Sequence, residues 1–584
     1  MGSSLLWRSH PLGNSWQLSL MVRTELWLLT ISCVIAVPDA ATSRRPNILF
    51  LMVDQMDGRL LDDASPQFKP PLHNLRSLAA EGAYFPQAYS SSPQCVPARS
   101  SMLAGRYPSQ IKVWDNFVGI AGVNGSVDEV DPHCIKAYSE KICRTFASVQ
   151  QIGGTFIDAL ADSGYNITLW GKMHAGAGLD RYPGKLSAFP FDGHSDPKAA
   201  LEWSRALGLS PDQDIPPLHT TDDAKWPATG VLDYPTTQTC AELLDAGLFK
   251  SEVPQFLYCS LLVPHAPYRT NASYLAEVPA LGNYSLPTWL PKAEVHPADE
   301  YMSKGKDYWR LDESSPDKVE HVRKVYFSMC VEADQLLGRI IDAFRRSSSL
   351  DESFVIMLGD HGDHAGENRM FGKNSFFEAA ARVPLMLAGP GIAKGQVIPD
   401  LTSLYDVYPT LLDMAGAAPK PELVGESLLP LARDGQKKSR DFVIAEYHSV
   451  YSATGTFMVR QGDLKLITYA PLQPSIAAWP PQLFDLKADP SEKQNLASAR
   501  PSDVERLTQL LEKDVDMNAA DAAKKNFDKQ MFKNFWYDET GGSKNCFRAM
   551  KRVYASFNAS DAERLSAWLG EPCPSEVKQA QIVV

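Results

Sequence analysis

Four stretches of the chain share one pattern, a run of apolar residues that ends at a polar or charged one. Continuous apolar runs of this length are typical of strands buried on both faces, as in parallel or mixed α/β sheets. Such sheets bind ligands at the carboxyl ends of their strands, so we expect the residues that follow these strands to converge on one crevice. The strands with their following residues are 47–53 before Asp54, 166–170 before 171–174, 256–263 before Pro264 and His265, and 354–359 before Asp360 and His361.

Helical and loop segments separate these strands. Residues 71–82 and 150–163 are predicted to be helical, and the segments 190–235 and 276–318 are interpreted as long loops that shape a substrate pocket. A further set of apolar residues is spaced for one buried face of a helix. Its members are Met329, Ala333, Leu336, Leu337, Ile340 and Phe344.

The pattern changes after Gly416, where short strands joined by turns are followed by one helix. The predicted strands are 442–447, 456–461, 464–469 and 482–486, and the predicted helix is 504–515. The fold class is therefore α/β, a large mixed, mostly parallel sheet sandwiched by helices, with a smaller C-terminal antiparallel α+β subdomain. The predicted parts are a signal peptide at 1–41, a catalytic domain at 46–416, the C-terminal subdomain at 417–520 and a tail at 521–584.

Composition narrows the possible partners. The 584 residues are 44% apolar and 22% charged, as expected for a globular protein with a large core. The net charge of −12 gives no sign of the basic surface that binds nucleic acids, so we expect no nucleic-acid partner. An anionic substrate stays compatible with this charge, because a local cluster of cations can bind an anion inside an acidic protein.

The N-terminus is typical of a secretory signal. Arg23 precedes an apolar stretch, 26–37, and the small residues Ala40 and Ala41 follow it. The stretch is shorter than a transmembrane helix, so an uncleaved anchor is the alternative and no stable membrane span is expected. Met21 is an alternative start. The predicted destination is the secretory pathway, ending in the lysosome or outside the cell.

Glycosylation sequons and cysteines agree with that route. The sequons begin at Asn124, Asn166, Asn271, Asn283 and Asn558. Cys259 and Cys330 lie in apolar segments and are predicted to be buried thiols. Connectivity cannot be derived from sequence, and the candidate pairs are Cys134 with Cys143 and Cys546 with Cys573.

One short motif carries the chemistry. Cys95, Pro97 and Arg99 form a Cys-x-Pro-x-Arg core that continues to Leu103–Arg106. An ordinary buried cysteine is the alternative interpretation of Cys95 alone. However, the core and six further elements, in their order along the chain, resemble the sulfatase family over roughly residues 46–500. These elements are Asp54, Gly171–His174, Pro264–Pro267, Gly359–Gly362, Lys373 with Glu378 and Arg382–Pro384, and Leu483–Leu486 with Asp489, Pro490, Asn495 and Leu496.

Within that family the chain is most similar to the arylsulfatase K subfamily. The resemblance implies a lysosomal exo-sulfatase that removes the 2-O-sulfate of glucuronate in glycosaminoglycans. The segments that carry it are Asp57–Arg59, Trp114–Phe117, Met329–Glu332 and Ser403–Thr410.

The family resemblance also implies a modified nucleophile. In sulfatases this cysteine, here Cys95, is oxidised by a formylglycine-generating enzyme to an aldehyde, whose hydrate attacks the sulfate ester. A sulfate monoester is an anion with a poor leaving group, so the reaction needs a strong nucleophile and a cluster of cations. The substrate implied is a sulfated carbohydrate.

The same resemblance implies one divalent cation, expected to be Ca²⁺ because the donors are mostly oxygens. The expected ligands are Asp54, Cys95, Asp360 and His361. Many sulfatases have two adjacent acids at the first position, whereas this chain has Asp54 followed by Gln55. The amide oxygen of Gln55 is a candidate ligand.

Basic residues of the motifs are assigned to catalysis by resemblance. Arg99 would support the formylglycine, Lys172 and Lys373 would neutralise the sulfate oxygens, His174 would act as base, and His265 would hydrogen-bond the sulfate or assist the leaving group. His364 and Arg369 are assigned to the surface, with recognition of a sugar carboxylate as the alternative.

Three other functions stay open. A phosphonate monoester or phosphodiester hydrolase of the same superfamily can share the cysteine-derived nucleophile. An inactive secreted sugar-binding relative would keep Cys95 unmodified. A Cys-His protease, with His174 or His265 as the partner, is the weakest alternative, because no protease signature accompanies these residues.

Overall fold

The computed structural model describes residues 44–116, 154–174, 179, 182–187, 233–266, 268–305, 316–448, 452–472, 478–538, 563 and 566–567. The predicted signal peptide, most of the 190–235 segment and the tail beyond 538, apart from three positions, lie outside these residues. The chain divides into two compact units, Met1–Arg44 and Arg45–Val584, and all elements below belong to the second. Among the described helices, none is long and apolar enough to cross a membrane.

An eight-stranded sheet forms the core of this unit, in the order β5-β4-β6-β1-β7-β8-β2-β9. The first five strands in this order are parallel, while β8 runs antiparallel to both β7 and β2. The predicted mixed, mostly parallel sheet is thus confirmed. Its strands are β1 Asn47–Val53, β2 Ala83–Tyr84, β4 Asn166–Lys172, β5 Gly184–Ser187, β6 Gln255–Ser260, β7 Ser353–Gly359, β8 Leu385–Ala388 and β9 Gln396–Val397.

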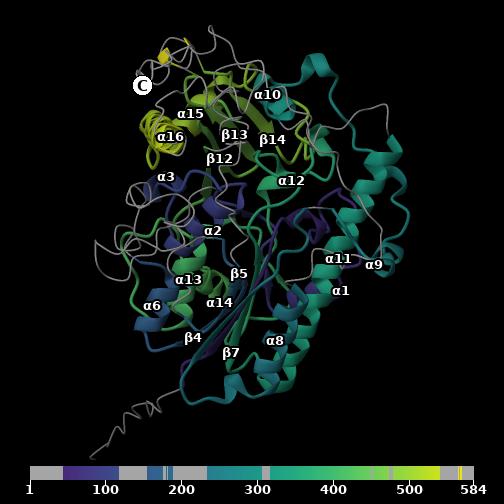
Figure 1. Cartoon of the computed structure of the whole chain (residues 1–584), viewed down its shortest axis with the longest axis vertical. Helices are drawn as coiled ribbons and strands as arrows, with labels where there is room; N and C mark the ends of the chain where they lie inside the picture. The colour runs from purple at the N-terminus through teal and green to yellow at the C-terminus, as the bar shows by residue number, and fades with distance from the viewer. Residues whose placement is uncertain are drawn as a thin grey trace, which may run out of the picture. The chain divides into compact units, whose positions relative to one another are not determined.

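Helices cover both faces of the sheet, with the sheet running between two groups of helices (Figure 1). Alternate residues of β1 belong to opposite cores, Phe50 to one and Leu51 to the other, because successive side chains of a strand point to opposite faces. This is why the strand sequence is apolar without alternation. One face is covered by α1 His73–Ala80, α8 Asp233–Asp245 and α11 Pro316–Ser347, and the other by α2 Cys95–Ala104, α6 Phe156–Asp162, α13 Val407–Met414 and α14 Leu429–Asp434.

The predicted helices are confirmed with shifted ends. The predicted helix 71–82 is α1, and α6 lies in 154–163, the described part of the predicted helix 150–163. The predicted apolar face lies on α11, where all six of its residues are buried. The 276–318 segment is only partly a loop, because it includes the short helices η5 Gly282–Tyr284, η6 Lys292–Glu294 and α10 Pro297–Gly305.

A second sheet lies toward the C-terminus and is antiparallel, in the order β11-β12-β13-β14. Its strands are β11 Phe442–Tyr447, β12 Thr456–Gln461, β13 Leu464–Tyr469 and β14 Gln482–Asp485, close to the predicted positions. Leu507 and Leu511 of α15 Pro501–Glu512 pack into one core with Val459 and Leu466 of this sheet. The next helix, α16 Met517–Asp538, runs through position 520, and the division of the chain at that position stays a prediction.

The remaining elements are short connections between these layers. They are η1 Gly58–Leu60, β3 Ala88–Tyr89, α3 Pro108–Ile111, η4 Leu248–Lys250, α9 Ala272–Glu277, η8 Glu367–Arg369, α12 Glu378–Ala381, β10 Thr402–Ser403 and η9 Leu404–Asp406.

One cysteine prediction is wrong. Cys259 on β6 is not a thiol but forms a disulfide with Cys240 on α8, with 6.5 Å between the Cα atoms. The contact arises because α8 packs on the sheet beside β6, which the sequence spacing does not show. Cys330 is a buried free thiol, as predicted. The four cysteines of the two candidate pairs lie outside the described residues.

Candidate active site

The candidate site lies where four parallel strands end side by side. In the order β4-β6-β1-β7, these strands carry Lys172 at the end of β4, His265 beyond β6, Asp54 after β1 and Asp360 after β7. Parallel neighbours end at one edge of a sheet, so the topology alone gathers residues that are 306 positions apart in the chain, from 54 to 360. The expected convergence of the strand-end residues is present.

Cys95 occupies the centre of this edge as the first residue of α2, and it is fully buried. Its Sγ lies 3.2 Å from His361 Nε2 and 3.7 Å from Asp54 Oδ1. Two ammonium groups also approach it, Lys373 Nζ at 2.9 Å and Lys172 Nζ at 3.7 Å. Burial opposes ionisation, yet the two lysines and His361 hold the pKa of the Cys95 thiol well below its ordinary value.

Arg99 lies one helical turn after Cys95, so both side chains point to the same side of α2. Its Nε donates to Asp360 Oδ2 at 2.7 Å and its Nη2 to Asp54 Oδ2 at 3.1 Å, while Nη1 donates to the backbone oxygen of Lys172 at 2.8 Å. This fully buried guanidinium therefore fastens the ends of β1, β4 and β7 together. It orients the two carboxylates.

Four side chains direct candidate metal-binding atoms at one point. The donor atoms of Asp54, Cys95, Asp360 and His361 all lie within 4.8 Å of one another. His361 Nδ1 contacts the backbone oxygen of Gly362 at 3.1 Å, an arrangement that leaves Nε2 to face the other three residues. Two carboxylates, an imidazole and the atom at position 95 form a donor set that fits a divalent cation.

The two carboxylates differ in their surroundings. Burial raises the pKa of Asp360, and the neighbouring Asp54 charge adds to the effect. Burial and Cys95 act on Asp54 in the same sense, but Lys172, His265 and Lys373 outweigh them and lower its pKa. Lys172 Nζ pairs directly with Asp54 Oδ2. A bound cation would be a further reason for both groups to be ionised.

Gln55 extends this group of donors. Its backbone takes a positive φ of 68°, its N–H donates to Asp360 Oδ1 at 3.1 Å, and its amide nitrogen donates to Asp363 Oδ2 at 2.5 Å. The residue that departs from the commoner family pattern therefore lies directly beside the candidate metal ligands.

Three further predicted residues, Lys373, His265 and His174, complete the surroundings of Cys95. Lys373 Nζ lies 2.8 Å from His265 Nε2, and the His265 side chain is 20% exposed while that of Asp54 is fully buried. Burial and then Lys373 lower the pKa of His265. Burial lowers the pKa of His174 to about 4, against a hydrogen bond with Cys95 that raises it. Both imidazoles are thereby favoured in their neutral forms.

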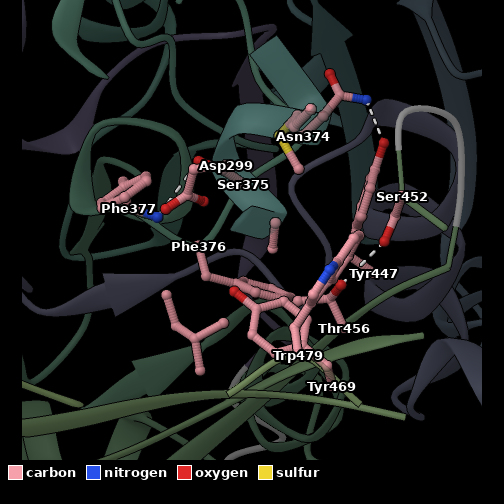
Figure 2. A pocket seen from close by; sticks show the side chains of 13 residues that line it. Asp299, Asn374, Ser375, Phe376, Phe377, Tyr447, Ser452, Thr456, Tyr469 and Trp479 are labelled. Atoms are coloured by element: carbon pink, nitrogen blue, oxygen red, sulfur yellow. Dashed lines mark hydrogen bonds between the residues drawn. The ribbon is translucent and has the colours of Figure 1, made fainter. Parts of the chain in front are cut away.

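A small cavity is lined by the residues that follow Lys373 in the chain. It has a volume of about 20 Å³ and lies between the 374–377 segment and the C-terminal sheet, with Tyr469 and Trp479 among its walls. This is room for a water-sized molecule and not for a sugar. Figure 2 shows the amide of Asn374 directed at the hydroxyl of Tyr447, and the hydrogen bond measures 2.5 Å. The cavity thus marks where the second sheet holds the chain next to Lys373.

The structure therefore brings together all of the predicted catalytic and metal-ligating residues. Sequence reasoning missed Asp363, Tyr258, Ser260 and Tyr268, which hydrogen-bond to the residues of the site. Asp363 follows the Asp-His-Gly motif by one position, and that closeness was the only available signal.

Other predicted residues have different positions. His364 and Arg369 are buried and not on the surface; His364 Nε2 contacts Ser375 Oγ at 2.7 Å, and Arg369 stacks 4.8 Å above the Trp289 ring. Of the sequons, Asn166 and Asn283 are exposed and Asn271 is half-buried. Asn124 and Asn558 lie outside the described residues.

Comparisons with known proteins agree with this geometry. The family described as Sulfatase matches residues 46–417, and the family described as N-sulphoglucosamine sulphohydrolase, C-terminal, matches residues 366–520. Arylsulfatase K of Mus musculus is 30% identical over 538 residues, which cover 86% of this chain and 88% of that protein.

Solved structures share the fold. Phosphonate monoester hydrolase of Agrobacterium radiobacter superimposes with a TM-score of 0.57 at 22% identity, covering 82% of this chain and 97% of that chain. A structure described as a 2-O GAG sulfatase gives a TM-score of 0.55 at 22% identity, covering 80% and 91%. Because the sulfatase family match spans well over half of the sequence, the chain belongs to the sulfatase family and is an enzyme that hydrolyses sulfate esters.

Proposed function

We propose that this enzyme removes sulfate from sulfated sugars by means of a formylglycine derived from Cys95, and that its substrate is the 2-O-sulfated glucuronate of glycosaminoglycans. One observation carries the proposal: Cys95 Sγ lies at the point where two lysines, three imidazoles and a pair of carboxylates converge. An unmodified structural cysteine would have no need of these neighbours.

The modified residue and the cation supply two kinds of chemistry. The hydrated aldehyde offers one hydroxyl that attacks sulfur and displaces the sugar alcohol, and a second that, once deprotonated, releases sulfate and restores the aldehyde. A Ca²⁺ ion held by Asp54, Asp360, His361 and position 95 would withdraw charge from the sulfate oxygens. The Sγ atom marks where the reacting oxygen of the modified residue would lie.

The residues of this chain then have separate roles. Arg99 holds both carboxylates in place through its hydrogen bonds. Lys172 and Lys373 are placed to neutralise the sulfate oxygens, since both ammonium groups are directed at Sγ. His174 lies beside position 95 and, with its low pKa, is ready to accept the proton of the second hydroxyl. His265, beside Lys373, is placed to contact the sulfate or the leaving oxygen.

The substrate assignment rests on similarity. Arylsulfatase K of Mus musculus is 30% identical to this chain over 86% of its length, and one structure of the same fold is described as a 2-O GAG sulfatase. The segments Asp57–Arg59 and Met329–Glu332 support the same subfamily. We also propose, from the N-terminal pattern and the sequons, a glycoprotein of the lysosome or extracellular space that meets a formylglycine-generating enzyme during synthesis.

A phosphonate monoester hydrolase is the second candidate, because an enzyme of that activity shares the fold over 82% of this chain. The rates on matched sulfate and phosphonate esters separate the two. A preference for the phosphonate ester would replace sulfate as the proposed substrate.

The first test is mass spectrometry of the peptide that contains Cys95, from protein secreted by a eukaryotic host. Conversion of the thiol to the aldehyde lowers the mass by about 18 Da. The Cys95→Ala variant should fold, with the same unfolding midpoint within a few degrees, and lose sulfate release. Retained turnover in that variant would refute the mechanism, whereas the free cysteine Cys330, changed to alanine, is the control for a thiol outside the site.

A further inference from the structure

Asp363 lies directly behind Gln55 and makes an unusually complete set of contacts. The carboxylate is fully buried and accepts four hydrogen bonds. Oδ2 accepts from Gln55 Nε2 at 2.5 Å and from the Tyr268 hydroxyl at 2.6 Å. Oδ1 accepts from the backbone N–H groups of Ala365 at 2.7 Å and Gly372 at 3.0 Å.

These contacts determine the orientation of the Gln55 amide. A carboxylate that receives hydrogen bonds from all sides can face only the NH₂ end of an amide. The carbonyl end of Gln55 must therefore point away from Asp363. The backbone N–H of Gln55 is bonded to Asp360, and the residue before it is Asp54, so position 55 lies directly beside the candidate metal group.

The departure of this chain from the two-acid pattern then has a physical reason. An acid at position 55 would put two buried carboxylates at hydrogen-bond distance with no proton between them, which is strongly unfavourable. With glutamine at 55, the negative charge resides on Asp363, behind the amide. It acts on the candidate metal group by polarising that amide.

We propose that Asp363 is a positioning residue that orients the Gln55 amide so that its carbonyl oxygen, and not its nitrogen, faces the bound cation. The inference rests on the proposed metal-dependent function, and it makes residues 55 and 363 one unit, an amide and an acid whose identities must be matched. Asp363 also holds the N–H of Gly372, next to Lys373, so the unit lies close to both the metal group and a catalytic cation.

An exchange of the two groups tests this unit. Gln55→Glu, which keeps the shape of the side chain, opposes two carboxylates, and Asp363→Asn lets the Gln55 amide turn over. Each single variant should weaken Ca²⁺ binding by about ten-fold or more, the usual range for residues behind a metal ligand. The double variant Gln55→Glu/Asp363→Asn restores one acid and one amide, and its affinity should return to within about three-fold of the wild type.

The readout is Ca²⁺ affinity by calorimetric titration of the full chain, with sulfate release measured in parallel. Asp334→Asn is the matched control, because Asp334 is another buried carboxylate that accepts bonds from two backbone N–H groups and one side-chain amide. It lies on α11 and makes these contacts with Asn74 and Leu75, so this variant should lose stability without losing Ca²⁺ affinity.

The outcomes are distinct. Tighter Ca²⁺ binding in Gln55→Glu, or no recovery in a double variant that folds, overturns the inference. The Ca²⁺ titration does not measure turnover, so a protein that shows the recovery but, with Cys95 converted to formylglycine, releases no sulfate contradicts the proposed function and leaves the pairing of 55 and 363 standing.

Discussion

Two groups of buried charges lie at opposite ends of the 373–378 segment, and they are built differently. The first is the candidate active site, with Arg99, Lys172 and Lys373 against Asp54 and Asp360. The second, which we call the fastening cluster, consists of Asp62, Glu378, Arg382, Arg460, Lys465 and Glu492. Three cations meet three acids in the fastening cluster, whereas in the active site three cations meet two.

In the fastening cluster, the charged side chains pair with one another. Lys465 is fully buried and donates to Glu378 Oε1 at 2.8 Å and to the backbone oxygen of Phe376 at 2.7 Å, and it pairs with Glu492. Burial opposes ionisation of Glu378, but Lys465, Arg460 and Arg382 lower its pKa to about 2. This cluster joins the second sheet to α12 and holds the chain that follows Lys373.

In the active site, the positively charged side chains outnumber the acids, and a ligand can neutralise the difference. A bound cation increases this excess of positive charge further. An anion would therefore complete the group. Like charges that are kept close together for a ligand lower the stability of the fold and serve function. The paired charges of the fastening cluster stabilise the fold and take no part in catalysis. Substitutions of one lysine from each group should therefore have opposite consequences.

The largest effect is expected on stability, from Lys465→Met. Removal of one partner from a buried ionic cluster costs about 3–5 kcal/mol of the free energy of unfolding, because Glu492 and Glu378 stay buried without this cation. The measurement is urea unfolding, with Lys487→Met, a change at an exposed lysine, as control. The remaining folded enzyme should keep most of its turnover number; a loss of turnover larger than the loss of folded protein would contradict the division into two groups.

Lys373→Met should act on catalysis. Removal of one preorganised electrostatic contact to a reacting group lowers kcat by about 10²–10³-fold. The unfolding midpoint should not fall, since Lys373 lies among other cations. Sulfate release and urea unfolding on the same preparation check both statements, with the exposed Lys394→Met as control. A strongly destabilised variant would show that Lys373 belongs with the fastening cluster.

Glu332 offers a third kind of buried charge, an acid for which the described residues show no paired lysine or arginine. Burial raises its pKa to about 8 from 4.5, Asp233 adds to the increase, and Tyr234 opposes it. The folded state therefore binds more protons than the unfolded state between these two values. Stability from this group is complete at acidic pH and decreases as the pH rises toward 8.

Glu332→Gln should remove part of that dependence. At pH 8 the variant should be more stable than the wild type by an amount on the order of 1 kcal/mol or more, and at pH 5 the difference should shrink. Thermal unfolding at several pH values measures this, with the exposed Glu352→Gln as control. Equal midpoints at pH 8 would mean that Glu332 is ionised in the folded protein and has a partner of its own.

The sequence predicted those parts of the molecule that follow from local pattern. The strands β1 and β7 could be located almost to the residue because each is a continuous apolar run, and Asp54 and Asp360 could be placed because they follow those runs. Contacts between distant segments leave no such pattern. The pairing of Gln55 with Asp363, of Cys240 with Cys259, and of Glu378 with Lys465 depends on how layers pack.

The smallest effect is expected where the two groups are connected. Asn374, the residue after Lys373, donates its amide to the Tyr447 hydroxyl of β11 at 2.5 Å, and its backbone N–H to Pro93, two residues before Cys95. Tyr447→Phe removes the first of these bonds and should cost about 1 kcal/mol of stability. It should also lower kcat/KM a few-fold, because Lys373 is then less well positioned.

Tyr469→Phe, which removes a hydroxyl bonded to Gln482 within the same sheet, should cost similar stability without that kinetic change. Equal kinetics in both variants would mean that Pro93 alone positions this segment, and that the second sheet stabilises the fold without tuning the active site.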